Sequence, residues 1–167
     1  MTLLTDHSTR SAHPAVTRES IHPGSRSPQE PPVDPSAFVA GQDLIRALQP
    51  RSTPTPCHHD RILFHQGDEA TGIYILLSGG ATLTMQSNSG EEVMRLDCGS
   101  GSVLGLPALI GNKPYSLTAL AHAGAGVCFV SHDEFTHLMA AEPLLSMKVL
   151  EILAAEVHLA RKAIFDT

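Results

Sequence analysis

Histidine and cysteine are the residues of this chain best suited to bind a metal or haem, and the sequence has ten of the first and three of the second. They are densest in the stretch CHHD, residues 57–60. Neighbouring side chains on a strand point to opposite faces, so Cys57 and His59 can share a face that excludes His58. The spacings C-x-x-C and H-x-x-x-H and the haem motif C-x-x-C-H are missing from the sequence. We therefore predict no metal site, and a metal- or haem-dependent sensor stays an alternative.

Motifs for enzymatic chemistry are missing as well. The sequence contains no G-x-S-x-G nucleophile elbow and no G-x-x-x-x-G-K-[ST] phosphate loop. Cys57, Cys98 and Cys128 have no electropositive sequence context, so the sequence does not indicate a reactive thiolate. We predict that the protein is not an enzyme and has no catalytic residues.

Charge and hydropathy exclude other classes of partner. Residues 1–56 hold five basic and five acidic residues, residues 57–167 hold six basic and twelve acidic residues, and the net charge is −6. An acidic folded region is a poor partner for a phosphate backbone, so we expect no direct nucleic-acid binding. The chain has neither an apolar run of the roughly 18–20 residues that a membrane span needs nor a signal-peptide layout. With three scattered cysteines, we expect a cytoplasmic protein with no membrane partner.

Four regions must position any functional residues. Residues 1–35 are rich in Pro, Ser, Arg and His, which predicts a disordered tail. Residues 36–56 predict a short helix and then a Pro-rich linker, a stiff connection or an extended edge. Residues 57–130 hold short β-prone runs spaced about 10–15 residues apart, which is typical of an antiparallel jelly roll or sandwich. Residues 131–167 have a helical period, so we expect C-terminal helices.

The helical region begins with a capping box, because Glu134 follows Ser131 by three residues. Pro143 suits the first turn of a second, uninterrupted helix. This helix has two apolar stripes, and a β-barrel can cover only one of them. We therefore predict a homodimer through a stripe with heptad spacing. This stripe, the seam, consists of Leu150, Leu153, Val157, Ala160 and Ile164, and the neighbouring stripe consists of Leu145, Val149, Ile152 and Leu159.

The β-rich region and the segment VLGLPALIGNKPYSLTALA, residues 103–121, resemble the cyclic nucleotide-binding domain of the catabolite activator (Crp/Fnr-like) family and of cyclic-nucleotide-dependent kinases. The resemblance covers about residues 61–158. It implies a double-stranded β-helix, or jelly roll, followed by C-terminal helices, which the strand spacing favours independently. The residues that carry it are Gly67, Asp68, Ala70, Tyr74, Gly79, Gly90, Glu91, Gly99 and Gly105.

The segment 103–121 corresponds to the family's phosphate-binding cassette, which reads roughly G-E-x-A-L and then P-R-[SA]. In the family, backbone N–H groups and the Arg bind the cyclic phosphate, and the Glu binds the ribose. Here Leu106 stands at the Glu position and Tyr115 at the Arg position. Losing both contacts removes about 3–6 kcal/mol of binding free energy. We therefore expect a cassette-like short helix that does not bind cyclic nucleotides tightly. We predict no other cofactor. The candidate binding residues are Gly105, Leu106, Pro107, Ala108, Tyr115 and Ser116.

The expected way in which the protein passes on a signal also differs from that of the family's transcription factors. Its transcription factors carry a helix-turn-helix domain after the long helix, whereas this sequence ends at Thr167. The resemblance therefore implies a stand-alone sensory or regulatory module for signalling or transcription regulation. Its degenerate pocket would respond to a small molecule or a partner. A ligand-free dimerisation or scaffold domain is the main alternative.

Overall fold

The computed structural model describes residues 38–165, and side-chain burial is described as far as residue 162. The predicted tail, residues 1–35, lies outside the described residues. The elements are α1 (Gln42–Leu48), the 3₁₀ helix η2 (Gln49–Arg51), β1 (Thr53–Thr55), β2 (Arg61–Phe64), β3 (Gly72–Ser78), β4 (Ala81–Gln86), β5 (Glu92–Cys98), β6 (Val103–Leu104), α2 (Leu106–Gly111), β7 (Thr118–Ala121), β8 (Gly126–Ser131), α3 (His132–Ala141) and α4 (Pro143–Phe165).

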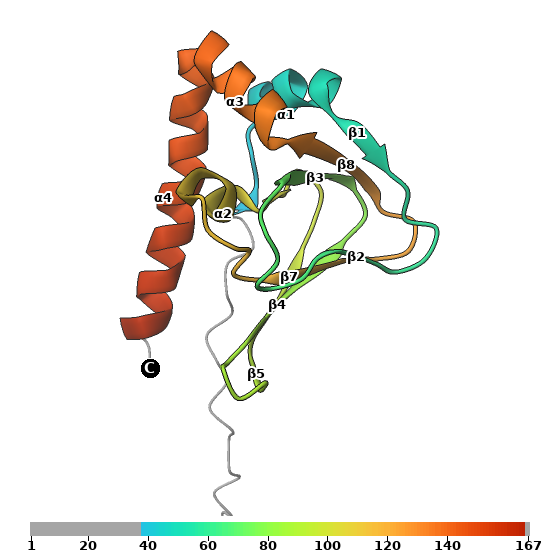
Figure 1. Ribbon diagram of the computed structural model, residues 1–167, viewed down its shortest axis with the longest axis vertical. Helices are drawn as coiled ribbons and strands as arrows, with labels where there is room; N and C mark the ends of the chain where they lie inside the picture. Colours follow the sequence, from blue (N-terminus) through green and yellow to red (C-terminus); the bar gives the residue numbers. More distant parts are fainter. Residues whose placement is uncertain (1–37, 166–167) are drawn as a thin grey trace, which may run out of the picture. The chain divides into compact units, whose positions relative to one another are not determined.

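The strands form two four-stranded antiparallel sheets, ordered β1-β8-β3-β6 and β2-β7-β4-β5 (Figure 1). Strands that are distant in sequence lie side by side; for example, β3 pairs with β8 in the register Tyr74↔Phe129. Such crossed ordering of two facing sheets is a jelly roll, so the predicted fold class is confirmed.

The Pro-rich stretch is part of this fold. Strand β1 pairs with β8 at the edge of its sheet, and Pro54 lies opposite Cys128. Proline is tolerated there because an edge strand leaves half of its backbone groups outside the ladder. The stretch is therefore an extended edge and not a separate linker.

Side chains of β3 alternate between the two faces of its sheet and are buried on both. Tyr74 and Leu76 point into the space between the two sheets, the barrel interior, whereas Ile73 and Ile75 point to the helices. The buried residues accordingly form two clusters, one inside the barrel and one between the sheet and the helices. The helix-facing cluster includes Leu44, Leu48, Val103, Leu106, Phe135, Val149 and Ile152.

The helix boundaries follow local capping. The side-chain oxygen of Ser131 accepts a hydrogen bond of 3.3 Å from the Glu134 N–H, which confirms the Ser131 half of the capping box. The Glu134 carboxylate instead pairs with Arg51 at 3.3 Å. Pro143 opens α4 as predicted. Helix α1 is shorter than the predicted 36–48. It starts after Gly41 because the preceding residues bond to the segment before β6 instead, through an Ala40 N–H to Gly101 carbonyl bond of 2.9 Å.

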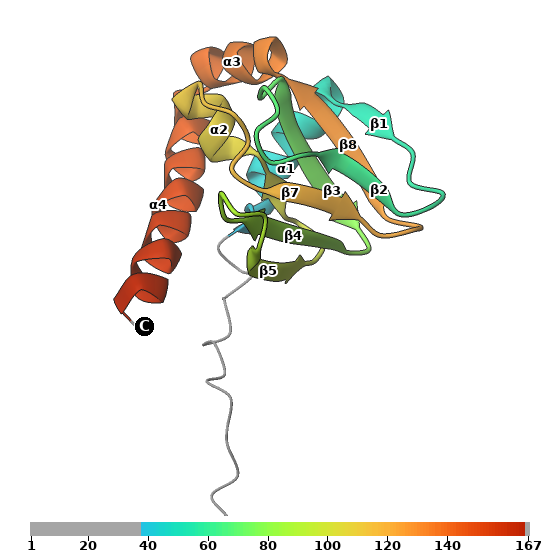
Figure 2. The same ribbon diagram turned by 60° about the horizontal axis from the view of Figure 1, so that its bottom comes forward.

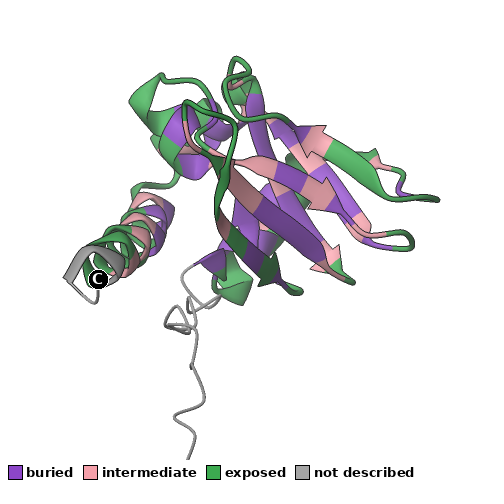
Figure 3. Cartoon of the chain, turned by 90° about the horizontal axis from the view of Figure 1, so that it is seen from below, coloured by how far each residue is buried: buried purple, intermediate pink, exposed green. Residues whose placement is uncertain are grey.

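Helix α4 runs beside the barrel, with α2 between α4 and the strands (Figures 1 and 2). Its residues are buried along one side and exposed along the other (Figure 3). The stripe that contains Val149 and Ile152 packs inward, whereas Leu150 and Val157 of the seam are 54% and 50% exposed. None of the helices in the described part of the chain is long and apolar enough to cross a bilayer.

Candidate ligand-binding site

Helix α2 has the short form expected of the cassette. It spans Leu106–Gly111, Pro107 lies in its first turn, and it ends at Asn112, whose φ of 50° is left-handed. The Asn112 N–H bonds to the Ala108 and Leu109 carbonyls and so closes the helix after six residues. The prediction of a short helix starting near Pro107 is confirmed.

Gly105, the residue before α2, is required by two features of the turn. Its φ is 98°, a conformation that residues with a Cβ rarely adopt. A Cβ at this position would also lie 2.9 Å from Cε1 of Tyr115. The turn therefore brings the backbone of residue 105 directly against the Tyr115 ring.

Tyr115, at the family's Arg position, lies inside the barrel and is 4% exposed. Its ring stacks on Phe64, with the ring centroids 3.9 Å apart and the planes 17° from parallel. Its hydroxyl donates a 2.6 Å hydrogen bond to the Gly72 carbonyl. The Tyr115 N–H also bonds to the Asp68 carbonyl at 2.9 Å. The side chain that would carry the anion-binding charge is replaced by one that bonds to the barrel's own backbone.

Aromatic rings continue from Tyr115 across the barrel. The Phe64 ring centroid lies 5.8 Å from that of Tyr74, which in turn lies 5.0 Å from that of Phe129. Burial raises the pKa of the Tyr74 hydroxyl, and the neighbouring Tyr115 adds to this rise. The described aromatic residues therefore offer no fixed charge to an anionic ligand.

Leu106, at the family's Glu position, is fully buried, but in the helix-facing cluster. Ala108, two residues later, belongs to the barrel interior. The structure thus places the predicted candidates Leu106 and Tyr115 in different clusters. A glutamate at position 106 in this conformation would put a charge among Ile73, Val103 and Phe135.

The remaining candidates supply little polar chemistry. Ser116, predicted above to be a binding residue, is exposed and so does not line the barrel interior. Pro107 has no N–H, which removes one backbone donor from the start of α2. Lys113 is exposed beyond the other end of α2. The cassette keeps its backbone shape and has lost its charged groups.

The histidine-rich stretch is a loop before β2. Cys57 is buried in the barrel interior, whereas His58 and His59 are exposed, so the three do not converge. Asp60 accepts a 2.8 Å hydrogen bond from the Ala123 N–H, which ties the loop to the turn before β8. Within residues 38–165, no group of three His, Cys, Asp or Glu residues could hold a metal ion.

A polar network on the outer face of the second sheet was not predicted. The Thr82 hydroxyl donates to Asp97 at 2.8 Å and lies 2.7 Å from Nε2 of His122. Thr82 and Asp97 face each other across β4 and β5. Short-range periodicity could not have indicated this network, because it joins three separate strands or turns.

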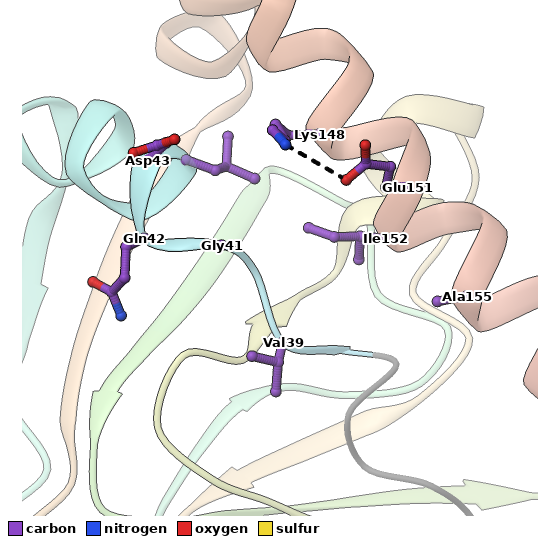
Figure 4. A pocket seen from close by; sticks show the side chains of 9 residues that line it. Val39, Gly41, Gln42, Asp43, Lys148, Glu151, Ile152 and Ala155 are labelled. Atoms are coloured by element: carbon purple, nitrogen blue, oxygen red, sulfur yellow. Dashed lines mark ion pairs between the residues drawn. The ribbon is translucent and has the colours of Figure 1, made fainter.

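Two surface hollows flank α4. One of about 280 Å³ lies between the start of α1 and α4, and its ion pair, Lys148 with Glu151 at 3.9 Å, lies within α4 itself (Figure 4). The other, of about 350 Å³, lies between α2, α3 and α4 and is lined largely by apolar residues. Ile110 and Leu150 border this groove and are about half exposed. Both hollows lie outside the barrel, away from Tyr115.

The sequence matches the model of one protein family, described as the cyclic nucleotide-binding domain, over residues 56–142, just over half of the chain. No curated protein matches it. The matched range includes the whole cassette and Tyr115, so the geometry above lies within the part that carries the family match.

Solved structures share the fold at low sequence identity. The catabolite activator protein of Thermus thermophilus matches with a TM-score of 0.66 and 19% identity, over 78% of this chain and 62% of that one. A transcriptional regulator from Thermotoga maritima matches with a TM-score of 0.64 and 15% identity, over 72% and 95%. The sensor domain of the Pseudomonas aeruginosa transcriptional regulator DNR matches with a TM-score of 0.57 and 18% identity, over 73% and 82%. The chain spans 57 to 62% of the length of three of the matched structures, including the Thermus protein.

Proposed function

The chain belongs to the cyclic nucleotide-binding domain family, and from that membership we propose a sensory or regulatory module whose barrel does not bind cyclic nucleotides. The proposal rests on the position of Tyr115. Its buried ring and its bond to the Gly72 carbonyl occupy the place from which a family arginine would meet the cyclic phosphate. A nucleotide phosphate would have to displace this ring and would gain no counter-charge in return.

Relatives of this fold support a role in regulation. The matched structures include a catabolite activator protein and a sensor domain of a transcriptional regulator. We propose that this module likewise passes a signal to a partner, in the cytoplasm, where its buried and unpaired Cys57, Cys98 and Cys128 would stay reduced. The signal is a protein contact or a small molecule less polar than a cyclic nucleotide.

The module acts as a homodimer in this proposal, formed through the seam of α4. Leu150 and Val157 are about half exposed, Ala160 is exposed, and Leu153 is partly buried. The burial of Ile164 lies outside the described side chains. The inner stripe is already covered by the barrel and the other helices, so the seam is the apolar face of α4 left for a second copy.

Calorimetry tests the nucleotide part of the proposal. Titration of the full chain with cyclic AMP or cyclic GMP should show no binding with a Kd below about 10 µM, given the roughly 3–6 kcal/mol removed with the two charged groups. Tighter binding by the wild type would overturn it. Native mass spectrometry of the purified chain should be run in parallel, because a co-purifying molecule supports a sensor and a consistently empty chain supports the scaffold alternative.

Sedimentation tests the dimer. The double variant Leu153→Asp with Val157→Asp should be monomeric where the wild type is dimeric, because two charges per helix would enter the apolar seam. The matched control is Ala155→Asp with His158→Asp, which adds two carboxylates at exposed positions of the same helix outside the seam. A wild type that is monomeric at tens of micromolar would refute the dimer.

A further inference from the structure

Glu156 interrupts the inner stripe of α4. Leu145, Val149, Ile152 and Leu159 are spaced at alternating intervals of three and four residues, and position 156 completes that series between Ile152 and Leu159. The first three are at most 8% exposed, and Leu159 packs against the barrel-interior cluster. A carboxylate thus lies in a line of side chains that is otherwise apolar.

Glu156 has no counter-charge within the described part of its own chain. The residues one helical turn away, at three and four positions before and after it, are Ile152, Leu153, Leu159 and Ala160. No hydrogen bond or ion pair joins Glu156 to another described residue. Burial raises the pKa of the Glu156 carboxyl to about 7.

The strand end beside Glu156 carries no lysine or arginine. The ionisable residues around it are Asp97 and Cys98 of β5 and His122, which lies 2.7 Å from the Thr82 hydroxyl. Burial raises the pKa of the Cys98 thiol to about 11, so the thiol is neutral, and the charges of Asp97 and Glu156 add to that rise. Asp97 is itself bonded to the Thr82 hydroxyl. The neighbouring segment 99–102 is Gly-Ser-Gly-Ser and carries no charge.

The heptad register of the seam places Glu156 at the edge of the proposed dimer interface. With Leu150 and Val157 at a and Leu153 and Ala160 at d, Glu156 falls at a g position and Arg161 at the following e position. In a parallel two-stranded coiled coil, a g residue faces the partner's e residue five positions later. The other e and g positions from 147 to 163 carry no charge, being Met147, Val149, Ala154 and Ala163.

We take the two α4 helices of the proposed homodimer to be parallel, and we propose that Arg161 of each copy forms an ion pair with Glu156 of the other. This inference rests on the proposed homodimer and adds a specific contact to it. Arg161 is exposed in the single chain, so it is accessible to a partner. The two-fold symmetry of such a dimer forms the ion pair twice.

The ion pair makes dimerisation depend on pH. In the single chain Glu156 holds its proton up to about pH 7, whereas beside the partner's arginine it is ionised. Each Glu156 therefore releases a proton on pairing when the pH is below 7. The association constant should fall by up to about 100-fold per pH unit below that point, since two groups titrate in each dimer.

Charge variants measured by sedimentation test the contact. Arg161→Glu places two carboxylates together at both sites and should raise the dimer Kd about 10- to 100-fold at pH 8. Lys162→Glu is the control, because it makes the same charge change at an exposed f position next along the helix. Adding Glu156→Arg to Arg161→Glu should restore much of the affinity. Glu156→Gln should flatten the pH dependence of the dimer Kd, because the histidines that still titrate are the same in both proteins.

Cross-linking tests the orientation. Ala160→Cys should form an intermolecular disulfide on mild oxidation, because d residues of parallel helices face each other, whereas Ala155→Cys at an f position should not. If the wild type dimerises but Arg161→Glu behaves like Lys162→Glu, the ion pair is refuted and the dimer stands. If Ala160→Cys does not cross-link in a dimer, the parallel arrangement is refuted. A monomeric wild type would refute the proposed dimer itself.

Discussion

Apolar side chains are buried in the barrel interior but remain exposed on the outer face of α4. Inside the barrel, where the family binds its ligand, Tyr115 and Phe64 stack and fill the space with the chain's own atoms. On α4, Leu150 and Val157 remain about half exposed, and Leu150 borders an apolar groove. The site expected to receive a ligand is occupied from within, and a helix face expected to pack is left open. The barrel interior is therefore filled by the chain itself, whereas α4 keeps an exposed apolar face.

The largest effect should come from emptying the barrel. Tyr115→Ala removes a buried aromatic ring and its hydrogen bond, so we expect the free energy of unfolding to fall by about 3–5 kcal/mol. Urea denaturation followed by circular dichroism measures this. The exposed neighbour Ser116→Ala is the control and should change stability little. A loss below about 1 kcal/mol for Tyr115→Ala would mean that the ring does not support the barrel.

The second largest effect should be a difference in stability loss between substitutions on the two faces of α4. Ile152→Ala, on the inner face, should lower the free energy of unfolding by about 2–4 kcal/mol, because its side chain is 6% exposed. Leu150→Ala, on the seam, should cost less than about 0.5 kcal/mol at concentrations where the protein is monomeric. Equal losses in denaturation experiments would show that both faces pack within one chain.

A smaller effect should separate the tyrosine ring from its hydroxyl. Tyr115→Phe keeps the stacking on Phe64 and removes the bond to the Gly72 carbonyl, so it should cost about 1–2 kcal/mol. The comparison with Tyr115→Ala then separates the contribution of ring packing to stability from that of the hydrogen bond. A cost as large as that of Tyr115→Ala would assign the whole effect to the hydroxyl.

The smallest effect concerns Glu156 in the monomer. The pKa of its carboxyl is about 7 in the folded chain and lower when unfolded, so the folded state binds the extra proton and loses stability as pH rises from about 4.5 to 7. At pH 8, and at concentrations that keep the protein monomeric, Glu156→Gln should raise the free energy of unfolding by about 1 kcal/mol, with the full linkage value reduced by partial solvent exposure. Thermal denaturation against pH measures this, with exposed Glu151→Gln as control. A wild-type stability that increases between pH 5 and 7, with the same slope in Glu156→Gln, would contradict it.

Several local features were predictable from neighbouring residues alone. The helix cap at Ser131, the Pro143 helix start and the short helix at Pro107 depend on contacts within one or two turns, and the structure confirms all three. The extent of α1 was overestimated because residues 39–40 pair with the distant segment 101–102, and the local pattern does not show this competing pairing.

The sequence by itself determined the jelly-roll class, the loss of charge at positions 106 and 115, and the two stripes of α4, because these follow from residue types and their spacing. The tertiary structure decided where the uncharged side chains go. Tyr115 points into the barrel and bonds to Gly72, whereas Leu106 turns to the helices. It also decided which stripe of α4 the barrel covers, and so left Glu156 without a counter-charge in the described chain. Such outcomes depend on packing between residues that are distant in sequence, and spacing along the chain carries no information on which of them meet.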